Sequence, residues 1–421
     1  MNIRRHRLAM AVTAIALALP LPVLADAVTY WNEYASGAVI APTGSPPQQA
    51  RVTAMVQIAV HDALNAIDPR YKAYNVLGTF KPSASPDAAV ARATCDVLVG
   101  VLPAASHAAV EGKCAEYLAT LACPTAHPGC IAQGEAAGAA AAAAMLAARH
   151  LDGSENPHRP YTLAAAPGVH QDTGGGVLFG GWGDVRTFAI GSASQFPPGK
   201  ARMLHLRSPQ YAADYNEVKA IGSAAVRGHP DNVESEESRI ARFWAGSARD
   251  YNRYTRTILA GMAPRDTWDN ARLFALVNLA VADAIIATFR VKYQYNFWRP
   301  VTAIRWGEEG NPMTTHAPED ATWTPYITTP PYPDYTCGQP TLISGSTAML
   351  REYFGTDDIA FDHSSAGMTR HFDSLSQAAN EVAVARVYSG IHFRTGCLRA
   401  LEQADDIAGF VYQTQLQPRR K

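Results

Sequence analysis

Hydrophobic residues recur at intervals of three and four along most of this chain, which is the spacing of amphipathic helices. In the first half this pattern predicts helices over residues 48–67, 86–102, 104–121 and 134–150. In the second half it predicts helices over residues 211–225, 234–246, 249–262, 269–297, 340–354 and 374–389, and another after His392. No block of residues alternates in the way that strands do. The predicted fold class is therefore mainly α.

Residues 151–200 interrupt the helical pattern with many glycines and prolines, among them Gly174–Gly176 and Pro197-Pro198. Such a stretch is typical of a long irregular segment on the surface or over the mouth of a site. It ends an N-terminal helical region, residues 26–200, and a C-terminal helical region follows over residues 201–421. We expect the two regions to form one continuous domain.

The N-terminus has the pattern of a secretory signal peptide. Basic residues between Met1 and Arg7 precede an apolar run from Leu8 to Leu24, and a small residue stands before the expected cleavage site at Ala25. A membrane anchor is the alternative, but the run is short and contains two prolines. No later apolar run looks long enough to span a bilayer. These features predict a periplasmic or secreted protein without a membrane partner.

The 421 residues carry a formal net charge of −1, so the composition favours neither a nucleic acid nor an anionic membrane as partner. Six cysteines in an exported chain favour disulfides, and none has the spacing of a zinc site. We expect Cys337 to pair with Cys397. The four N-terminal cysteines should pair among themselves, with Cys123–Cys130 closing a short loop.

Lys292 and Arg299 stand seven residues apart, which would place both cations on one face of a helix. The residues around them are aromatic, which favours a walled pocket or a cation–π surface. Taken alone, such a pair is also typical of a solvated basic face.

Two downstream segments complete a possible anion site. The loop 328–339 leads into a predicted helix, with Gly338 at the turn and Pro340 fitting the first helical position. Arg386 and His392 do not share a helix face, but a break near Ser389-Gly390 would let His392 turn back toward Arg386. Three cations, a backbone turn and a histidine suit a tetrahedral oxyanion.

These segments resemble the vanadium haloperoxidase and type 2 phosphatidic acid phosphatase superfamily. Lys292–Pro300 matches its K-x6-R-P signature, and Ala385–His392 matches its S-R-x5-H signature with the serine replaced. Cys337–Gln339 stands where that superfamily carries P-S-G-H. Phrases around Trp31-Asn32 and His61-Asp62 are similar to its secreted bacterial haloperoxidase-like branch.

The resemblance implies a helical bundle with long irregular loops and an oxyanion, vanadate or phosphate, at its centre. Lys292, Arg299 and Arg386 would hold the equatorial oxygens, and the backbone N–H of Gly338 would add a donor. His392 would bond vanadium, or would attack phosphorus as the nucleophile of a phosphatase. In a haloperoxidase Lys292 would polarise peroxide, a halide would leave as hypohalous acid, and vanadium would act as a Lewis acid.

Two departures from the signatures bear on activity. Gln339 replaces a histidine expected to exchange protons, and an amide cannot do so near neutral pH. Such acid–base help is typically worth about 10²–10⁴-fold in rate, whether the reaction is halide oxidation or phosphoester hydrolysis. Cys337 replaces a serine. Paired with Cys397 it would brace the Gly338 loop beside His392, whereas reduced it would be an acidic, reactive thiol.

Other residues are candidates to assist the site. His316 or His363 is a candidate for the missing acid, although each is also typical of an ordinary surface histidine. Asp283, nine residues before Lys292, is a candidate to orient a cation from behind the site, or an inward carboxylate paired with one.

Three functions follow from these residues. The first is a haloperoxidase-like oxidoreductase that uses peroxide and halide. The second is a periplasmic phosphatase that acts on a soluble phosphoester through a phospho-His392 intermediate. The third is an oxyanion-binding member with altered activity, and Gln339 is the residue that discriminates among them.

Overall fold

The computed structural model describes residues 26–42, 44–199, 201–228, 234–246, 250–313 and 320–419. The predicted signal peptide, residues 1–25, and His316 lie outside the described residues. The described part is mainly α, as the sequence predicts. Its α-helices are α1 (Ala27–Glu33), α2 (Pro46–Ile67), α3 (Pro86–Val101), α4 (His107–Ala119), α5 (Cys130–Ala148), α6 (Pro209–Ile221), α7 (Ala224–Arg227), α8 (Glu236–Gly246), α9 (Tyr251–Ala260), α10 (Thr267–Tyr295), α11 (Pro300–Arg305), α12 (Gly338–Phe354), α13 (Leu375–Tyr388) and α14 (Arg394–Thr414).

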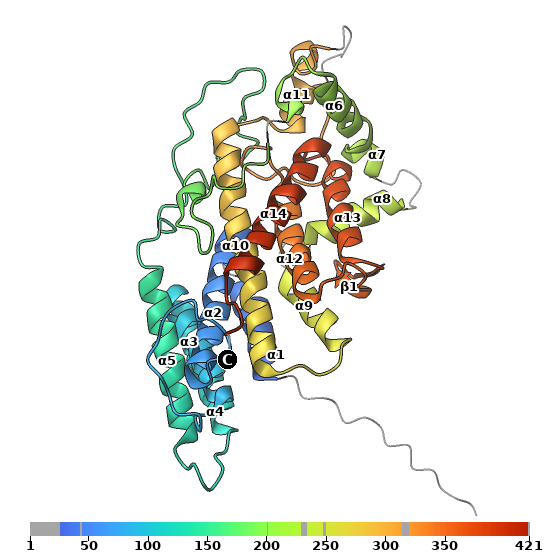
Figure 1. Cartoon of the computed structure of the whole chain (residues 1–421). Coiled ribbons are helices and arrows are strands. Elements are labelled where there is room, and N and C mark those ends of the chain that lie inside the picture. Colours follow the sequence, from blue (N-terminus) through green and yellow to red (C-terminus); the bar gives the residue numbers. More distant parts are fainter. Residues whose placement is uncertain are drawn as a thin grey trace, which may run out of the picture.

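Helix α10 is the central element of the fold (Figure 1). It packs against α2 on one side and against α12 and α14 on the other. Helices α5 and α10 are both long and apolar enough to cross a membrane by length and composition, which corrects the expectation that no such run exists. In α10, however, 94% of the apolar window is buried inside the protein, as in the core helix of a helical bundle.

The N-terminal helices form a tightly packed group around α3 and α5, at the lower left of Figure 1. Small residues on α5 allow this close approach. A Cβ added at Gly134 would lie 2.2 Å from the carbonyl oxygen of Ser85, and one added at Gly138 would lie 2.5 Å from that of Ala89. The small-residue helix predicted from the sequence therefore packs closely against its neighbour.

The sequence pattern missed a β-hairpin between α12 and α13. Strand β1 (Phe361–Ser365) pairs antiparallel with β2 (Met368–Phe372). The two residues of the turn, Ala366 and Gly367, have φ of 50° and 76°, the geometry of the primed turns that close two-residue hairpins. The buried and exposed positions of β1 alternate, but five residues are too short a run for this signal to stand out.

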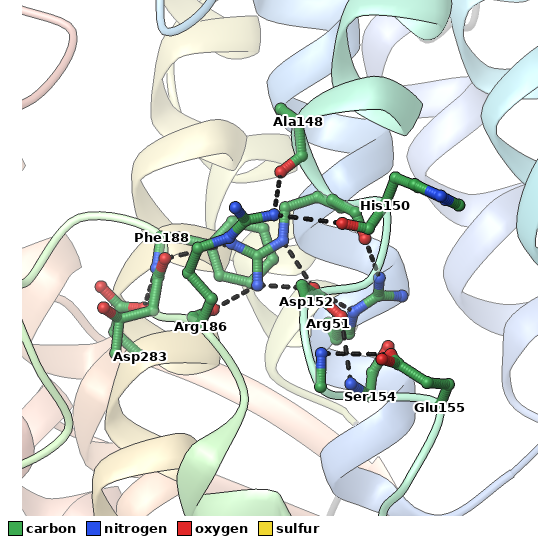
Figure 2. A network of polar contacts seen from close by, with 12 residues as sticks. Arg51, Ala148, His150, Asp152, Ser154, Glu155, Arg186, Phe188 and Asp283 are labelled. Atoms are coloured by element: carbon green, nitrogen blue, oxygen red, sulfur yellow. Dashed lines mark hydrogen bonds and ion pairs between the residues drawn. The ribbon is translucent and has the colours of Figure 1, made fainter.

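The long irregular segment between α5 and α6 is fixed to the bundle by polar contacts (Figure 2). The carboxylate of Asp152 lies 2.8 Å from Nε of Arg51 on α2 and 2.7 Å from Nη2 of Arg149. Arg149 also donates to the carbonyls of Arg186 and Thr187, which lie further along the segment. The Gly- and Pro-rich stretch is therefore held at its start and again near residue 186, although it contains little helix.

Asp283 holds the same segment on α10 and does not act on the cations of the predicted site. Its carboxylate accepts the backbone N–H groups of Phe188 at 2.6 Å, Ala189 at 2.7 Å and Ile190 at 2.9 Å. The reason lies in helix geometry, because nine residues of α-helix make two and a half turns. Asp283 and Lys292 consequently point to opposite sides of α10. The expectation that Asp283 orients a cation of the site, or pairs with one, is wrong.

Three disulfides are present: Cys95–Cys114, Cys123–Cys130 and Cys337–Cys397. The four N-terminal cysteines pair among themselves, as expected. The third bridge joins the start of α12, which carries Gly338, to α14, which begins just after His392.

Candidate functional site

Lys292 and Arg299 do lie together, but not on one helix face. Lys292 is in the last turn of α10, which ends at Tyr295, and the next residue, Asn296, has φ 49° and ψ 37°. Arg299 is the N-cap of α11, where the following Pro300 disfavours a helical conformation. A turn between two helices therefore brings the cations together, and the prediction of a single continuous helix is wrong here.

The loop before α12 wraps around both cations. Nζ of Lys292 donates to the carbonyls of Pro333 at 2.8 Å and Asp334 at 2.9 Å. Nε of Arg299 donates to the carbonyl of Tyr332 at 2.7 Å. The ring of Tyr332 lies 5.2 Å from Nζ of Lys292 and 5.1 Å from Cζ of Arg299, within cation–π range. Both cations are fully buried.

Asp334 is a buried carboxylate at this centre that the sequence analysis did not single out. Its Oδ1 lies 2.5 Å from Nδ1 of His392 and 3.7 Å from Nη1 of Arg299. Burial raises the pKa of Asp334 to about 7, although Arg299 and Lys292 act in the opposite direction. In the sequence, Asp334 is an acidic residue of the proline-rich loop next to an aromatic residue. That pattern gave no reason to expect a buried carboxylate.

His392 contacts both Asp334 and Arg299. Helix α13 ends at Tyr388, and Gly390 has φ 75°, so the chain turns back as predicted. Nη1 of Arg299 lies 2.9 Å from Nε2 of His392. The same Nη1 lies 3.3 Å from Nδ1, but a guanidinium can only donate and its shorter contact is with Nε2, so we assign Nε2 as the acceptor and the proton to Nδ1, which faces Asp334.

The electrostatics of the site support this neutral form. Burial lowers the pKa of His392 well below its ordinary value, and the positive charges of Arg299, Lys292 and Arg386 lower it further. A neutral imidazole is the form whose Nε2 lone pair, which accepts from Arg299 in this structure, can instead bond a metal or act as a nucleophile.

Arg386 reaches the same centre from α13 and is held by Gln339. Nη1 of Arg386 donates to Oε1 of Gln339, and Nε2 of Gln339 donates to the carbonyl of Trp244. Both ends of the amide are therefore occupied. Gln339 fixes the side chain of Arg386 in this structure, a role that the sequence analysis did not foresee for the substituted position.

Gly338 begins α12, two residues earlier than predicted, with Cys337 as its N-cap. Pro340 is therefore the third helical residue and not the first. The sulfur atoms of Cys337 and Cys397 and a ring nitrogen of His392 lie within 4.8 Å of one another. Because both cysteines are in a disulfide, this group is a brace beside His392 and not a set of thiolate ligands.

The site concentrates positive charge in a buried place. Burial lowers the pKa of Lys292 well below its ordinary value and lowers that of Arg386 to about 10, and the charge of Arg299 contributes in both cases. Asp334 is the carboxylate that the contacts place among these cations. Nη2 of Arg299 and Nε of Arg386 are buried and make no hydrogen bond in the described part of the chain. Unpaired buried donors and excess positive charge fit an oxyanion as ligand.

His363 is not part of this centre, and neither is it a surface residue. It lies in β1, is 2% exposed, and its Nε2 is 3.3 Å from Oδ2 of Asp250. Its ring packs edge-on against Phe243 and Tyr254. Another histidine, His170 in the long irregular segment, does lie near the cations, and nothing in the sequence around it indicated that position.

Comparison with known proteins gives consistent results for the second half of the chain. The family model of the second helical-bundle domain of vanadium chloroperoxidase matches residues 272–420, which include all of the predicted catalytic and oxyanion-binding residues. The vanadium chloroperoxidase of Curvularia inaequalis is 31% identical over 30% of this chain. The matched part spans 28% of that relative's length.

The fold of nearly the whole chain is found in solved structures. A bacterial vanadium-dependent iodoperoxidase superposes with a TM-score of 0.79 at 23% identity, covering 96% of this chain and all of the other. A bacterial vanadium-dependent chloroperoxidase, in its apo form, superposes with a TM-score of 0.69 at 16% identity, covering 86% of this chain and 92% of the other.

Proposed function

Because this chain belongs to the vanadium haloperoxidase superfamily, we propose that it binds vanadate between Lys292, Arg299, Arg386 and His392 and catalyses peroxide-dependent oxidation of a halide. One observation carries this proposal. Three buried cations surround a histidine that is kept neutral with its Nε2 lone pair directed toward Arg299. This combination suits an anion that also forms a bond to an imidazole.

Each residue has a part that follows from its chemistry. Arg299 and Arg386 present guanidinium groups whose N–H atoms match two oxygens of a tetrahedral anion. Lys292 supplies a buried point charge, and the first N–H groups of α12, beginning at Gly338, add backbone donors. Asp334 keeps the proton of His392 on Nδ1. Bound vanadate would supply Lewis-acid activation of peroxide.

Gln339 limits the rate rather than the binding. Its amide cannot exchange a proton, so the position that carries a histidine in the family signature has no acid–base function here. It does hold Arg386. We therefore expect the protein to keep its affinity for the oxyanion. Its turnover should depend on another group that can exchange protons.

The test is to load the purified protein with orthovanadate and to measure halogenation of a phenolic dye with hydrogen peroxide and iodide, bromide or chloride. Titration calorimetry with vanadate and with phosphate measures binding separately. Lys292→Ala and Arg386→Ala should weaken binding of both anions. Arg290→Ala is a matched control, because Arg290 is also on α10 but is exposed and lies 3.2 Å from Asp184.

The outcomes separate the functions. Halogenation that requires vanadate supports the proposal. Binding of both anions without halogenation, together with hydrolysis of a phosphoester that is lost in His392→Ala, would favour a phosphatase. Binding without either activity would favour an oxyanion-binding protein, and no binding of either anion would refute the site.

We also propose that the protein acts after export from the cytoplasm. Three disulfides support this proposal, because such bonds persist in oxidising compartments. Fractionation of cells that produce the full chain, followed by N-terminal sequencing of the product, tests it. Export with cleavage near Ala25 is expected.

A further inference from the structure

His170 is placed beside the cation site by backbone pairing. The segment that contains it forms an antiparallel bridge in which Val169 pairs with Phe297. The backbone N–H of His170 donates to the carbonyl of Asn296 at 2.7 Å, and that of Trp298 donates to the carbonyl of Gly168 at 3.0 Å. Residues 296–298 form the turn that positions Arg299. His170 is therefore fixed to the same turn as a principal cation of the site.

The imidazole of His170 is buried, and its ring nitrogens make no hydrogen bond in the described part of the chain. The residue is 1% exposed. The ring packs edge-on against Tyr161 at 5.7 Å, and the Tyr161 hydroxyl donates to the backbone carbonyl of His170 and not to its ring. Buried polar atoms normally find partners, so two unpartnered ring nitrogens indicate a ligand-facing group.

The charged groups that act on His170 are those of the site. Burial lowers the pKa of His170 to about 3, and the positive charges of Arg299, next to α11, and Lys292, on α10, contribute. The free protein therefore holds a neutral imidazole there. An oxyanion bound to Arg299 and Lys292 would offset their charge and would raise the affinity of His170 for a proton.

A hollow is lined by residues that follow His170 and Arg299 in the chain. This hollow, of about 800 Å³, is lined by Gln171, which follows His170, and by Val301 and Thr302, which follow Arg299 and Pro300. Nε2 of Gln171 and the hydroxyls of Thr173 and Thr329, which also line it, are buried without hydrogen-bond partners. The hollow therefore brings unpaired polar groups close to the chain segments that carry His170 and Arg299.

We propose that His170 is the proton-exchanging residue of the oxyanion site, and that it performs the acid–base function that Gln339 cannot. The proposal rests on the proposed function, because a proton-exchanging group matters only if the site binds an oxyanion. It concerns a residue from the long irregular segment, outside the three signature motifs.

The reaction requires such a group. Oxidation of a halide follows H₂O₂ + X⁻ + H⁺ → HOX + H₂O, in which the halide loses two electrons and the O–O bond accepts them. Neutral His170 takes one proton as hydrogen peroxide becomes HOO⁻. It returns that proton to the oxygen that leaves as water, and a second proton comes from the solvent. The proton count then balances over one turnover.

The first experiment measures proton linkage and does not depend on turnover. Binding of phosphate is followed by calorimetry at pH 5.5 in buffers with different ionisation enthalpies, which gives the number of protons taken up. Compared with the wild type, His170→Gln should take up about one proton fewer while its phosphate affinity changes less than about tenfold. His205→Gln, which alters an exposed histidine, is the matched control and should behave as the wild type.

The second experiment measures the vanadate-loaded protein. We expect His170→Gln to lower kcat for halide oxidation by about 10²–10⁴-fold, the usual size of acid–base effects, and Gln339→His to restore part of it in the double variant. In the wild type, ¹⁵N signals of the His170 ring should move toward the imidazolium form when phosphate is added. This measurement needs no variant to fold.

The outcomes distinguish the two proposals. If the wild type binds no oxyanion, the proposed function and this inference fail together. If it binds phosphate but His170→Gln leaves both proton uptake and kcat unchanged, only the role of His170 is overturned. An unshifted His170 ring signal at saturating phosphate would overturn it as well.

Discussion

Nδ1 of His392 lies 2.5 Å from Oδ1 of Asp334, and both residues are buried beside Arg299. The shorter of the two contacts that Arg299 makes with the ring assigns Nε2 as the acceptor, and the proton is then on Nδ1, toward Asp334. A carboxylate that orients a ligating histidine and raises its basicity is a recurrent feature of metal sites. Asp334 should therefore affect phosphate and vanadate differently. Phosphate needs only the cations, whereas vanadate also needs a bond to His392.

Asp334→Asn tests that difference. Removing the negative charge leaves the cations less neutralised, so phosphate should bind at least as well as in the wild type. Vanadate should lose the contribution of a basic, correctly protonated His392, and the ratio of vanadate to phosphate affinity should fall about 10–100-fold. Calorimetry with both anions gives this ratio. Asp362→Asn, which alters an exposed Asp–His pair with His371, should leave it unchanged.

Gln339→Ala tests whether the amide positions Arg386. Loss of a hydrogen bond to a buried charged group should lower the free energy of unfolding by about 1–3 kcal/mol. Phosphate should bind about 10–30-fold more weakly, because fixing a freed arginine side chain costs about 1.5–2 kcal/mol of conformational entropy. Gln403→Ala is the control, since Gln403 donates to the carbonyl of Phe196 at 2.7 Å, away from the site. Equal losses of affinity in both variants would contradict the positioning role.

The sequence predicted the helices and the signature residues because those features depend on local periodicity and on short motifs. Lys292, Arg299, Arg386 and His392 all lie at one centre, as their motifs required. Their geometry was less predictable. Lys292 and Arg299 were expected on one face of a single helix, but a turn separates them because the left-handed Asn296 ends α10 and Pro300 begins α11.

Residues outside the motifs could not be placed from the sequence. Asp334 and His170 reach the site through a proline-rich loop and a Gly-rich segment, in which no periodicity fixes the direction of a side chain. Asp283 shows the opposite case. Its nine-residue spacing from Lys292 already placed it on the far side of α10, so helix geometry alone would have excluded it from the site.

The Cys337–Cys397 bridge should contribute more to stability than the N-terminal Cys123–Cys130 bridge. The two bridges join residues separated by 60 and 7 positions. Loop-closure entropy then gives contributions of about 4 and about 2 kcal/mol, respectively. Urea unfolding of the paired Cys→Ser variants measures both. Only the variant that lacks the Cys337–Cys397 bridge should also lose phosphate affinity, because that bridge braces the start of α12 beside His392.

Asp283→Ala should loosen the irregular segment without a large change in global stability. Its carboxylate accepts three backbone N–H groups, and each unpaired buried donor costs about 1–3 kcal/mol. Burial, however, raises the pKa of Asp283 to about 6, so its ionised form already carries a cost that the substitution removes.

Hydrogen exchange resolves these opposing effects. The amides of Phe188, Ala189 and Ile190 should exchange at least about tenfold faster in Asp283→Ala, since one lost hydrogen bond at ~1.4 kcal/mol corresponds to that factor. Asp172→Ala is the control, because Asp172 accepts backbone N–H groups of Gly174 and Gly176 in an exposed part of the same segment. Unchanged protection at the three amides would show that the segment is held by other contacts.

The pH dependence of stability provides an independent measure of the environment of His170. Burial, with Arg299 and Lys292, lowers its pKa from 6.5 to about 3. The unfolded chain therefore binds more protons than the folded protein between these values, and stability must fall as the pH decreases from 6.5 toward 3. The upper limit of this loss is about 5 kcal/mol, since each tenfold change in proton affinity corresponds to ~1.4 kcal/mol.

Replacing the imidazole with an amide that does not titrate should abolish this part of the acid-induced loss, so His170→Gln should lose less stability than the wild type as the pH falls. Denaturant unfolding of wild type, His170→Gln and His205→Gln at pH 7, 6, 5 and 4 isolates the effect, because contributions from Asp283 and Asp334 are common to all three proteins. Parallel stability curves would mean that His170 titrates normally and that its ring is not held beside the cations.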